Sequence, residues 1–274
     1  MVRTLRFLLA GLAMLFATQA SAQLLYAANG AGGNLADLVI LDPATGAVVQ
    51  TIGPIGFSVT GLAFHPITRQ LYGSTGGADP VPANRNSLIR INTATGAGTL
   101  VGVITPGNPT ADITFAPNGT LYGWSEATDD LVTIDLTSGA GTVVGDSGLS
   151  TSASGTAYGN DGQIYHTSGG NLIRLDPRTG LPTRQTPIAQ TMNALAFSPN
   201  GILFGTNTTN NLFTIDTTTA AVTTIGPTIA NVDAIAFGPA PAVMGAAVPT
   251  LSQWALLLLV LVLGTAGIQA ARRR

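Results

Sequence analysis

A pattern that recurs five times constrains the fold of this chain more than any other feature. Each copy holds a short apolar strand ending in an aromatic residue, a turn, a second strand with its own aromatic residue, and an alternating third strand. The aromatic residue of the second strand recurs at Tyr26, Tyr72, Tyr122, Tyr165 and Phe204, so successive copies lie 46, 50, 43 and 39 residues apart. Four strands in about 40–50 residues is the period of a propeller blade.

The individual segments of the repeat have the properties of strands and hairpin turns. The first strands lie at 62–64, 113–115, 156–158, 195–197 and 235–237. The third strands alternate apolar and polar residues, as half-buried strands do. Each third strand is followed by a turn such as the one from Asp42 to Gly46, where Asp bonds to turn amides and Gly takes a left-handed conformation. A fourth strand completes each copy.

The order of the strands predicts a closed ring. The repeat region, residues 23–239, begins with a second strand and ends with an extra first strand at 234–237. Pairing of 234–237 beside 24–28 completes a fifth blade and leaves no open sheet edge between the ends. We therefore expect an all-β, five-bladed propeller, with an open solenoid or a sandwich as the alternatives. The Leu-Tyr-Gly and Asp-Pro-x-Thr-Gly patterns resemble those of bacterial exported propeller repeats, a class with mixed functions that implies no activity.

The first 22 residues have the pattern of a secretory signal peptide. Arg3 and Arg6 precede an apolar run at 7–17 that is too short to span a bilayer comfortably. Ala20 and Ala22 place small side chains at the two positions that signal peptidase reads, so the mature chain is expected to begin at Gln23. The alternative is an uncleaved anchor.

The other end of the chain is predicted to cross a membrane once. After a small-residue linker at 240–247, residues 255–271 contain no charged residue and are just long enough for a transmembrane helix. Trp254 lies at one edge of this helix, and Arg272, Arg273 and Arg274 lie at the other, where the positive-inside rule keeps them cytoplasmic. The repeat region then lies outside the inner membrane, in the periplasm or at the cell surface.

A short motif before this helix indicates sorting. Val248, Pro249, Thr250, Leu251 and Trp254, followed by the apolar helix and the Arg cluster, resemble the IPTL-CTERM sorting tail of bacteria over residues 248–274. Val248 departs from the usual Ile of the motif. The resemblance implies recognition, and cleavage, by an exosortase-type membrane enzyme. The alternative is a permanent single-pass anchor that begins with a similar sequence by chance.

Composition excludes several classes of function. Charged residues make up 9% of the chain, Cys is absent, and the six Arg residues of the middle region face thirteen acidic ones. A weakly acidic domain without basic clusters is not expected to bind nucleic acid. The absence of Cys excludes disulfides, thiolate nucleophiles and Cys-ligated zinc.

The sequence contains no catalytic constellation that we can assign, and neither a cofactor nor a metal is expected. His65 and His166 occupy non-equivalent positions, whereas a zinc site needs three or four ligands. Glu126, with Asp129 and Asp130, forms the densest acidic group, which is expected to lie in a solvated loop.

One set of residues is a candidate binding site. Polar residues near the start of the first strands should form a collar at one mouth of the central channel, where small ligands and ions bind in many propellers. These residues are Thr60, Asp112, Ser154, Asn193 and Asp233. Three functions follow from the sequence: a non-catalytic surface or matrix scaffold, a carbohydrate-active hydrolase or lyase using Asp112, Asp233 or the Glu126 group, and a small-ligand or ion-binding ring.

Overall fold

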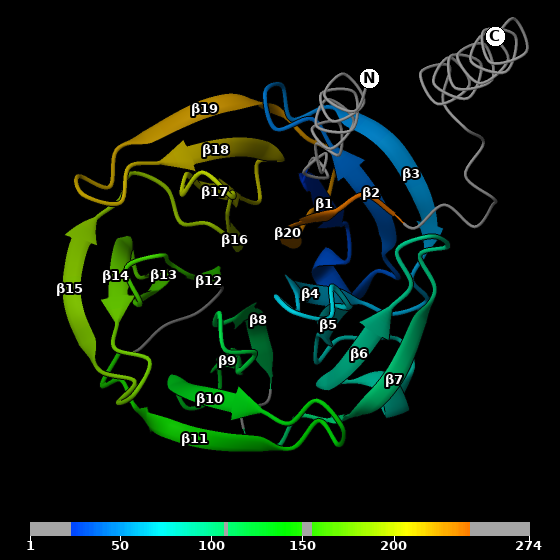
Figure 1. The fold of residues 1–274 in the computed structure, drawn as a ribbon, viewed down its shortest axis with the longest axis horizontal. Helices are drawn as coiled ribbons and strands as arrows, with labels where there is room; N and C mark the ends of the chain where they lie inside the picture. Colours follow the sequence, from blue (N-terminus) through cyan, green and yellow to red (C-terminus); the bar gives the residue numbers. More distant parts are fainter. Residues whose placement is uncertain (1–22, 107–108, 150–154, 242–274) are drawn as a thin grey trace, which may run out of the picture. The chain divides into compact units, whose positions relative to one another are not determined.

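The computed structural model describes residues 23–106, 109–149 and 155–241. These residues form five four-stranded antiparallel sheets around a central axis (Figure 1), which confirms the predicted five-bladed propeller. Blade 1 has the strand order β20-β1-β2-β3, counted outward from the axis. Blades 2 to 5 follow in chain order and contain β4–β7, β8–β11, β12–β15 and β16–β19.

Strands with the same position in their blades have matching sequences. The innermost strands are β4 (Val59–Phe64), β8 (Thr110–Phe115), β12 (Thr156–Tyr158), β16 (Ala194–Phe197) and β20 (Ala234–Pro239). The second strands are β1 (Gln23–Ala28), β5 (Leu71–Thr75), β9 (Leu121–Ser125), β13 (Ile164–Ser168) and β17 (Leu203–Thr206). The third strands are β2 (Asp37–Leu41), β6 (Ser87–Ile91), β10 (Asp130–Ile134), β14 (Asn171–Leu175) and β18 (Asn211–Ile215). The outermost strands are β3 (Val48–Pro54), β7 (Gly98–Val103), β11 (Gly141–Asp146), β15 (Pro182–Pro187) and β19 (Val222–Pro227). Two short 3₁₀ helices, η2 (Ala31–Gly33) and η3 (Pro82–Asn84), lie in loops.

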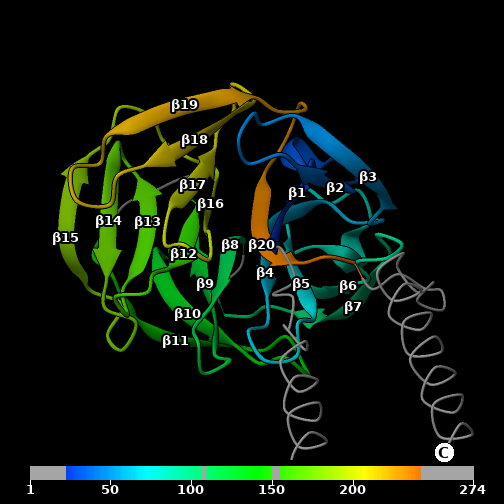
Figure 2. The same ribbon diagram turned by 45° about the horizontal axis from the view of Figure 1, so that its top comes forward.

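The ring closes as the strand order predicts. β20 pairs with β1 so that Phe237 lies opposite Leu25 and Ala234 lies opposite Ala28. Figure 2 shows β20 from the end of the repeat region beside β1 from its start. This pairing excludes the open solenoid and completes blade 1 from two distant segments.

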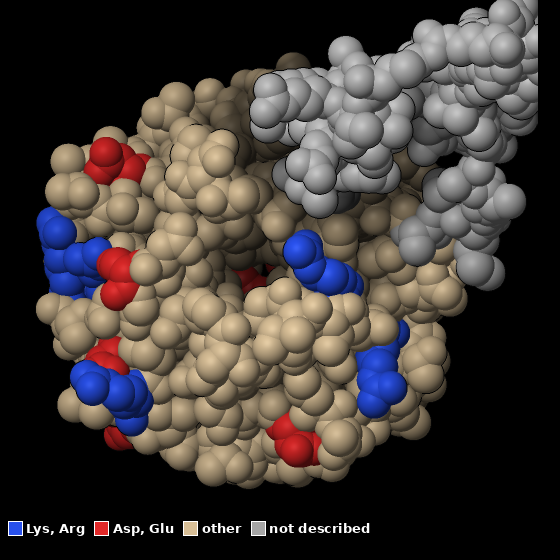
Figure 3. All heavy atoms as spheres, viewed as in Figure 1, with Lys and Arg blue, Asp and Glu red and all other residues tan. Residues whose placement is uncertain are grey.

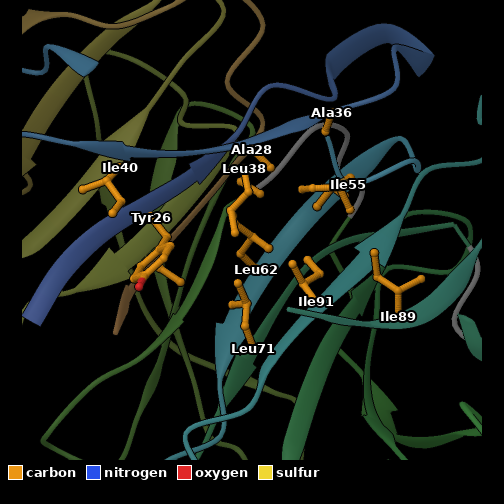
Figure 4. Close-up of a cluster of buried hydrophobic side chains, with 13 residues drawn as sticks. Tyr26, Ala28, Ala36, Leu38, Ile40, Ile55, Leu62, Leu71, Ile89 and Ile91 are labelled. Atoms are coloured by element: carbon orange, nitrogen blue, oxygen red, sulfur yellow. The ribbon is translucent and has the colours of Figure 1, made fainter. Parts of the chain in front are cut away.

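The hydrophobic core is divided among the five interfaces between neighbouring blades. Successive side chains on a strand point to opposite faces of its sheet, so each blade contributes to the two interfaces that flank it. Figure 4 shows the interface of blades 1 and 2, where Tyr26 and Leu38 meet Leu62, Leu71 and Ile91. A separate buried cluster occupies each of the other four interfaces.

The repeated aromatic residues join each blade to the next. In every interface the aromatic ring of a second strand packs against the terminal aromatic ring of the next blade's innermost strand, with centroids 5.0–6.2 Å apart. The five pairs are Tyr26 with Phe64, Tyr72 with Phe115, Tyr122 with Tyr158, Tyr165 with Phe197, and Phe204 with Phe237. Each such pair stabilises by about 0.5–1.5 kcal/mol beyond its buried area.

The turn between β2 and β3 has the predicted geometry. The Asp42 carboxylate accepts the amide of Ala44 at 2.8 Å and the hydroxyl of Thr45 at 3.0 Å, while Gly46 has a φ of 78°. A side chain on Gly46 would be strained at that φ and would also meet the backbone of the neighbouring blade, because its Cβ would lie 2.9 Å from the carbonyl oxygen of Gly226.

Several predicted segments lie outside the described residues. They are the signal peptide at 1–22, Ser154, the linker after residue 241, and the sorting motif and predicted helix within 248–274. In the part of the chain that the structure describes, no helix has the length and apolar character needed to cross a bilayer.

Candidate functional site: the central channel

The innermost strands line the channel with backbone groups as well as side chains. Each of these strands pairs on one side only, so alternate backbone N–H and C=O groups face the axis. On β16 the amide of Ser198 bonds to the carbonyl of Ile202 on the outward side, and the amide of Leu195 therefore faces inward. The channel thus presents inward-facing donors that the sheets themselves do not satisfy.

Asp112 occupies this ring of donors. Its Oδ1 accepts the amide of Ile113 at 2.8 Å, and its Oδ2 accepts the amides of Thr156 at 2.8 Å and Leu195 at 3.4 Å. One carboxylate therefore bridges β8, β12 and β16. Asp112 is fully buried, so the predicted collar residue lies within the channel wall rather than at an open mouth.

Small neighbouring residues create the space for this carboxylate. The other four blades carry Gly or Ala at the position equivalent to Asp112, which is on the innermost strand or directly before it: Gly61, Gly155, Ala194 and Ala234. A Cβ on Gly61 would lie 2.8 Å from Asp112 Oδ1, so even Ala at this position would collide with the carboxylate.

The pKa of Asp112 reflects two opposing effects. Burial, the larger effect, raises the pKa well above its usual value because the charged form loses water. The three amide donors oppose this rise, and the negative charge of Asp233 adds to it.

Thr114 lies two residues after Asp112 on β8 and has a similar role. Its hydroxyl accepts the amide of Tyr158 at 2.9 Å. The equivalent residues in the other innermost strands are Ala63, Ala157, Ala196 and Ala236. Sequence reasoning missed Thr114, although a single hydroxyl among four alanines was a usable signal. Strand β8 therefore supplies polar side chains to β12 at two successive levels.

The mouth of the channel near the start of the innermost strands contains the second acidic group. Asn193 Nδ2 donates to Asp233 Oδ1 at 3.3 Å. Burial raises the pKa of Asp233 to about 6, the bond from Asn193 opposes the rise, and the charge of Glu126 adds to it. Glu126, in the predicted loop between β9 and β10, thus interacts electrostatically with Asp233. Figure 3 shows acidic atoms within the central opening of the ring.

The remaining collar residue that the structure describes forms bonds between blades. The Thr60 hydroxyl donates to the carbonyl oxygen of Thr110 at 3.0 Å and lies 3.3 Å from Ser74 Oγ. Thr60, Asn193 and Asp233 are all partly or largely buried and bonded to other protein groups.

The opposite mouth is a small cavity. It has a volume of about 140 Å³ and is lined by the last residues of the five innermost strands, including the terminal aromatic of each.

Both histidines form hydrogen bonds within the described part of the fold. His65 Nδ1 accepts the amides of Ile67 and Thr68, both at 3.2 Å, as a turn residue does. His166 is fully buried and bonds through Nδ1 to Thr156 Oγ1 at 3.1 Å, and the centre of its ring lies 4.0 Å from that of Trp124. Burial lowers the pKa of His166 to about 3, so it is neutral at ordinary pH. Over the described residues, no three His, Asp or Glu side chains are grouped to hold a metal ion.

These features define a class, the five-bladed β-propeller with a channel crossed by its own hydrogen bonds. The chain belongs to the family described as "Repeat of unknown function (DUF6923)", whose model matches residues 26–191. The IPTL-CTERM motif matches residues 246–274, which confirms the predicted sorting tail. No curated protein matches the chain.

Solved structures share the fold. A chain in the crystal structure of a nidogen/laminin complex is 15% identical, with a TM-score of 0.54, covering 80% of this chain and 99% of that one. A second structure comes from work on the de novo evolutionary emergence of a symmetrical protein. It is 17% identical, with a TM-score of 0.54, and covers 81% of this chain and all of that one. At these identities the likeness concerns the fold alone.

Proposed function

We propose that this protein is a non-catalytic scaffold that is exported, sorted by its tail and displayed at the cell surface or in the extracellular matrix. Sorting is supported by the match of residues 246–274 to the IPTL-CTERM motif. The finer steps, which are recognition by an exosortase-type enzyme, membrane tethering through 255–271 and a cytoplasmic Arg cluster before cleavage, are part of the proposal.

The hydrogen bonds of Asp112 are the main support for a non-catalytic function. A catalytic carboxylate must reach a substrate, whereas Asp112 is fully buried and its two oxygens accept three backbone amides. This buried acid of the channel is therefore committed to holding three blades together. This use of Asp112 favours a scaffold over a carbohydrate-active hydrolase or lyase.

The pair of Asp233 and Asn193 favours a second candidate, small-ligand or ion binding at the channel mouth. Asp233 is hydrogen-bonded to Asn193 and interacts with the charge of Glu126, so a cation at the mouth would offset the repulsion between the two acids. Titration of the wild type and of Asp233→Asn with Ca²⁺, followed by calorimetry, tests this candidate. Heat of binding in the wild type that disappears in the variant would support it.

The sorting step is tested in the native host with Pro249→Ala combined with Thr250→Ala. Pro249 keeps the chain before the predicted helix extended, in a form that a processing enzyme can bind, whereas membrane insertion needs only hydrophobicity and flanking charge. The variant should insert normally and accumulate at full length with Arg274 attached. Pro241→Ala, outside the motif, is the control. If the wild type, the double variant and the control have the same size and location, the tail is a permanent anchor and not a sorting signal.

A further inference from the structure

The interface between blades 4 and 5 differs from the other four. In those four, a turn of one blade packs against a glycine on the outer strand of its neighbour, with a carbonyl oxygen 2.0–2.5 Å from where a Cβ would lie. The glycines and their neighbours are Gly53 with Thr95, Gly102 with Ser138, Gly145 with Thr179, and Gly226 with Thr45. In blade 4 the corresponding residue is Thr186, and Arg184 instead donates to the carbonyl oxygen of Thr218 at 2.6 Å.

A cavity opens at this interface. Its volume is about 240 Å³, and it lies among the turn of blade 4, strands β13 and β14, and two turns of blade 5. The residues that line it include Asn160, Asp161, Tyr165, Arg174, Phe197 and Thr217. The volume is below the roughly 300–1,000 Å³ of pockets for drug-sized ligands, so it suits a molecule of one small ring.

A charged cluster forms one wall of the cavity. Arg174 forms an ion pair with Asp161, and its Nε donates to the Tyr165 hydroxyl at 2.9 Å. The Tyr165 hydroxyl in turn donates to Asp161 Oδ2 at 2.8 Å, and the guanidinium lies 5.1 Å from the centre of the Tyr165 ring. These contacts fix the orientation of the guanidinium and the carboxylate. Figure 3 shows acidic and basic side chains side by side over blade 4.

Polar groups around the cavity remain available to a ligand. Among the described residues, Arg174 Nη1, the Asn160 side-chain amide and the Thr217 hydroxyl have no hydrogen-bond partner. Asp161 adds acceptor capacity, since a carboxylate can accept about four hydrogen bonds. The Phe197 ring, packed 5.2 Å from Tyr165, adds an apolar surface.

The charge of the cluster selects the class of ligand. Arg174 and Asp161 neutralise each other, so neither an anion nor a cation gains net attraction. Closely spaced donors and acceptors beside an aromatic ring match the hydroxyl groups and C–H faces of a sugar. We propose that the interface between blades 4 and 5 binds a neutral, polyhydroxylated ligand the size of one sugar ring. This site is distinct from the channel and does not depend on how the tail is processed.

The repeat itself provides variants that should fold. Asn118 and Asn200 occupy the position of Asp161 in blades 3 and 5, and Thr133 and Thr214 occupy that of Arg174. Asp161→Asn and Arg174→Thr therefore introduce residues that this fold already accepts. Arg90→Thr is the matched control, because Arg90 pairs with Tyr72 as Arg174 pairs with Tyr165 but has no ion pair among the described residues.

The test uses the protein as it is isolated from its host. Saturation-transfer NMR and calorimetry follow binding of a neutral hexose, deoxyhexose, pentose and N-acetylhexosamine, with glucuronic acid and inorganic sulfate as charged probes. We expect at least one neutral sugar to bind with millimolar affinity, and about a tenfold loss, or roughly 1.4 kcal/mol, in Asp161→Asn and in Arg174→Thr. Arg90→Thr should bind as the wild type does.

Three results would overturn the proposal. They are the absence of saturable binding by every neutral sugar, tighter binding of a charged probe than of any neutral sugar, and an equal loss of binding in Arg90→Thr. Melting temperatures of the three variants close to that of the wild type would confirm that a loss of binding is not a loss of fold.

Discussion

The hydroxyl of Tyr26 donates a hydrogen bond of 2.6 Å to the carbonyl oxygen of Pro239, joining two residues 213 positions apart. The bond lies where the first strand of the repeat region meets the last, beside the Tyr26 contact with Phe64 of blade 2. Burial raises the pKa of Tyr26 to about 12, so the hydroxyl stays protonated and able to donate over the ordinary pH range. Ring closure therefore depends on a side-chain bond as well as on strand pairing.

Removal of this bond should destabilise the ring. Tyr26→Phe keeps the aromatic contact but leaves the Pro239 carbonyl without its donor, which should lower the free energy of unfolding by about 1 kcal/mol. Tyr72→Phe is the control, because the Tyr72 hydroxyl has no hydrogen bond to another described residue although its ring packs against Phe115. Equal stability of the two variants in urea unfolding would show that the bond contributes nothing to closure.

The channel hydroxyl of Thr114 should contribute through its hydrogen bond alone. Ala occupies the equivalent position in the other four innermost strands, so Thr114→Ala creates no steric conflict and leaves the inward-facing amide of Tyr158 unpaired. We expect a loss of about 1–3 kcal/mol in the free energy of unfolding. Hydrogen exchange at Tyr158 should accelerate in the variant. Unchanged exchange at this amide would contradict the assigned bond.

The pKa of Asp233 predicts a pH-dependent contribution to stability. Its pKa is raised to about 6 in the folded protein, compared with about 3.8 in the unfolded chain. The stabilisation that comes from protonated Asp233 is therefore complete at pH values below 3.8. This contribution is lost as the pH rises through 6. Between pH 5 and pH 8 the wild type should therefore lose about 1 kcal/mol relative to Asp233→Asn.

The quantity to follow is the difference in free energy of unfolding between the wild type and Asp233→Asn, because the titration of His166 changes stability with pH in the opposite direction. His166 has a pKa lowered to about 3, so its contribution is full above the unfolded value near 6.5 and is lost as the pH falls. His166 is present in both proteins and cancels in the difference. A difference between them that stays constant from pH 5 to pH 8 would mean that Asp233 is not the titrating group.

The sequence predicted the architecture well because the repeat encodes it directly. The spacing of the aromatic residues gave the number of blades, and the second strand at Tyr26 with the extra first strand at Phe237 gave the closure. These are properties of strand order and periodicity, which a one-dimensional pattern contains.

The depth and partners of individual polar residues could not be predicted in the same way. Asp112 and Asp233 both lie near the start of a first strand, yet Asp112 is fully buried and bonded to three strands. Whether a carboxylate at such a position reaches the neighbouring innermost strands depends on the direction of its side chain. It also depends on the small residues opposite, such as Gly61. The cluster of Asp161 with Arg174 was hidden because an Asp in that position is also a typical turn residue.

The identity of the two ends of the protein isolated from its native host tests the account most directly. Intact-mass and peptide mass spectrometry of the extracellular or surface fraction should find a chain that begins at Gln23 and lacks the Arg cluster at 272–274, because we propose that the signal peptide and the sorting tail are both removed during export. A chain in that fraction that begins at Met1 and still ends at Arg274 would contradict both export by a cleaved signal and sorting by the tail.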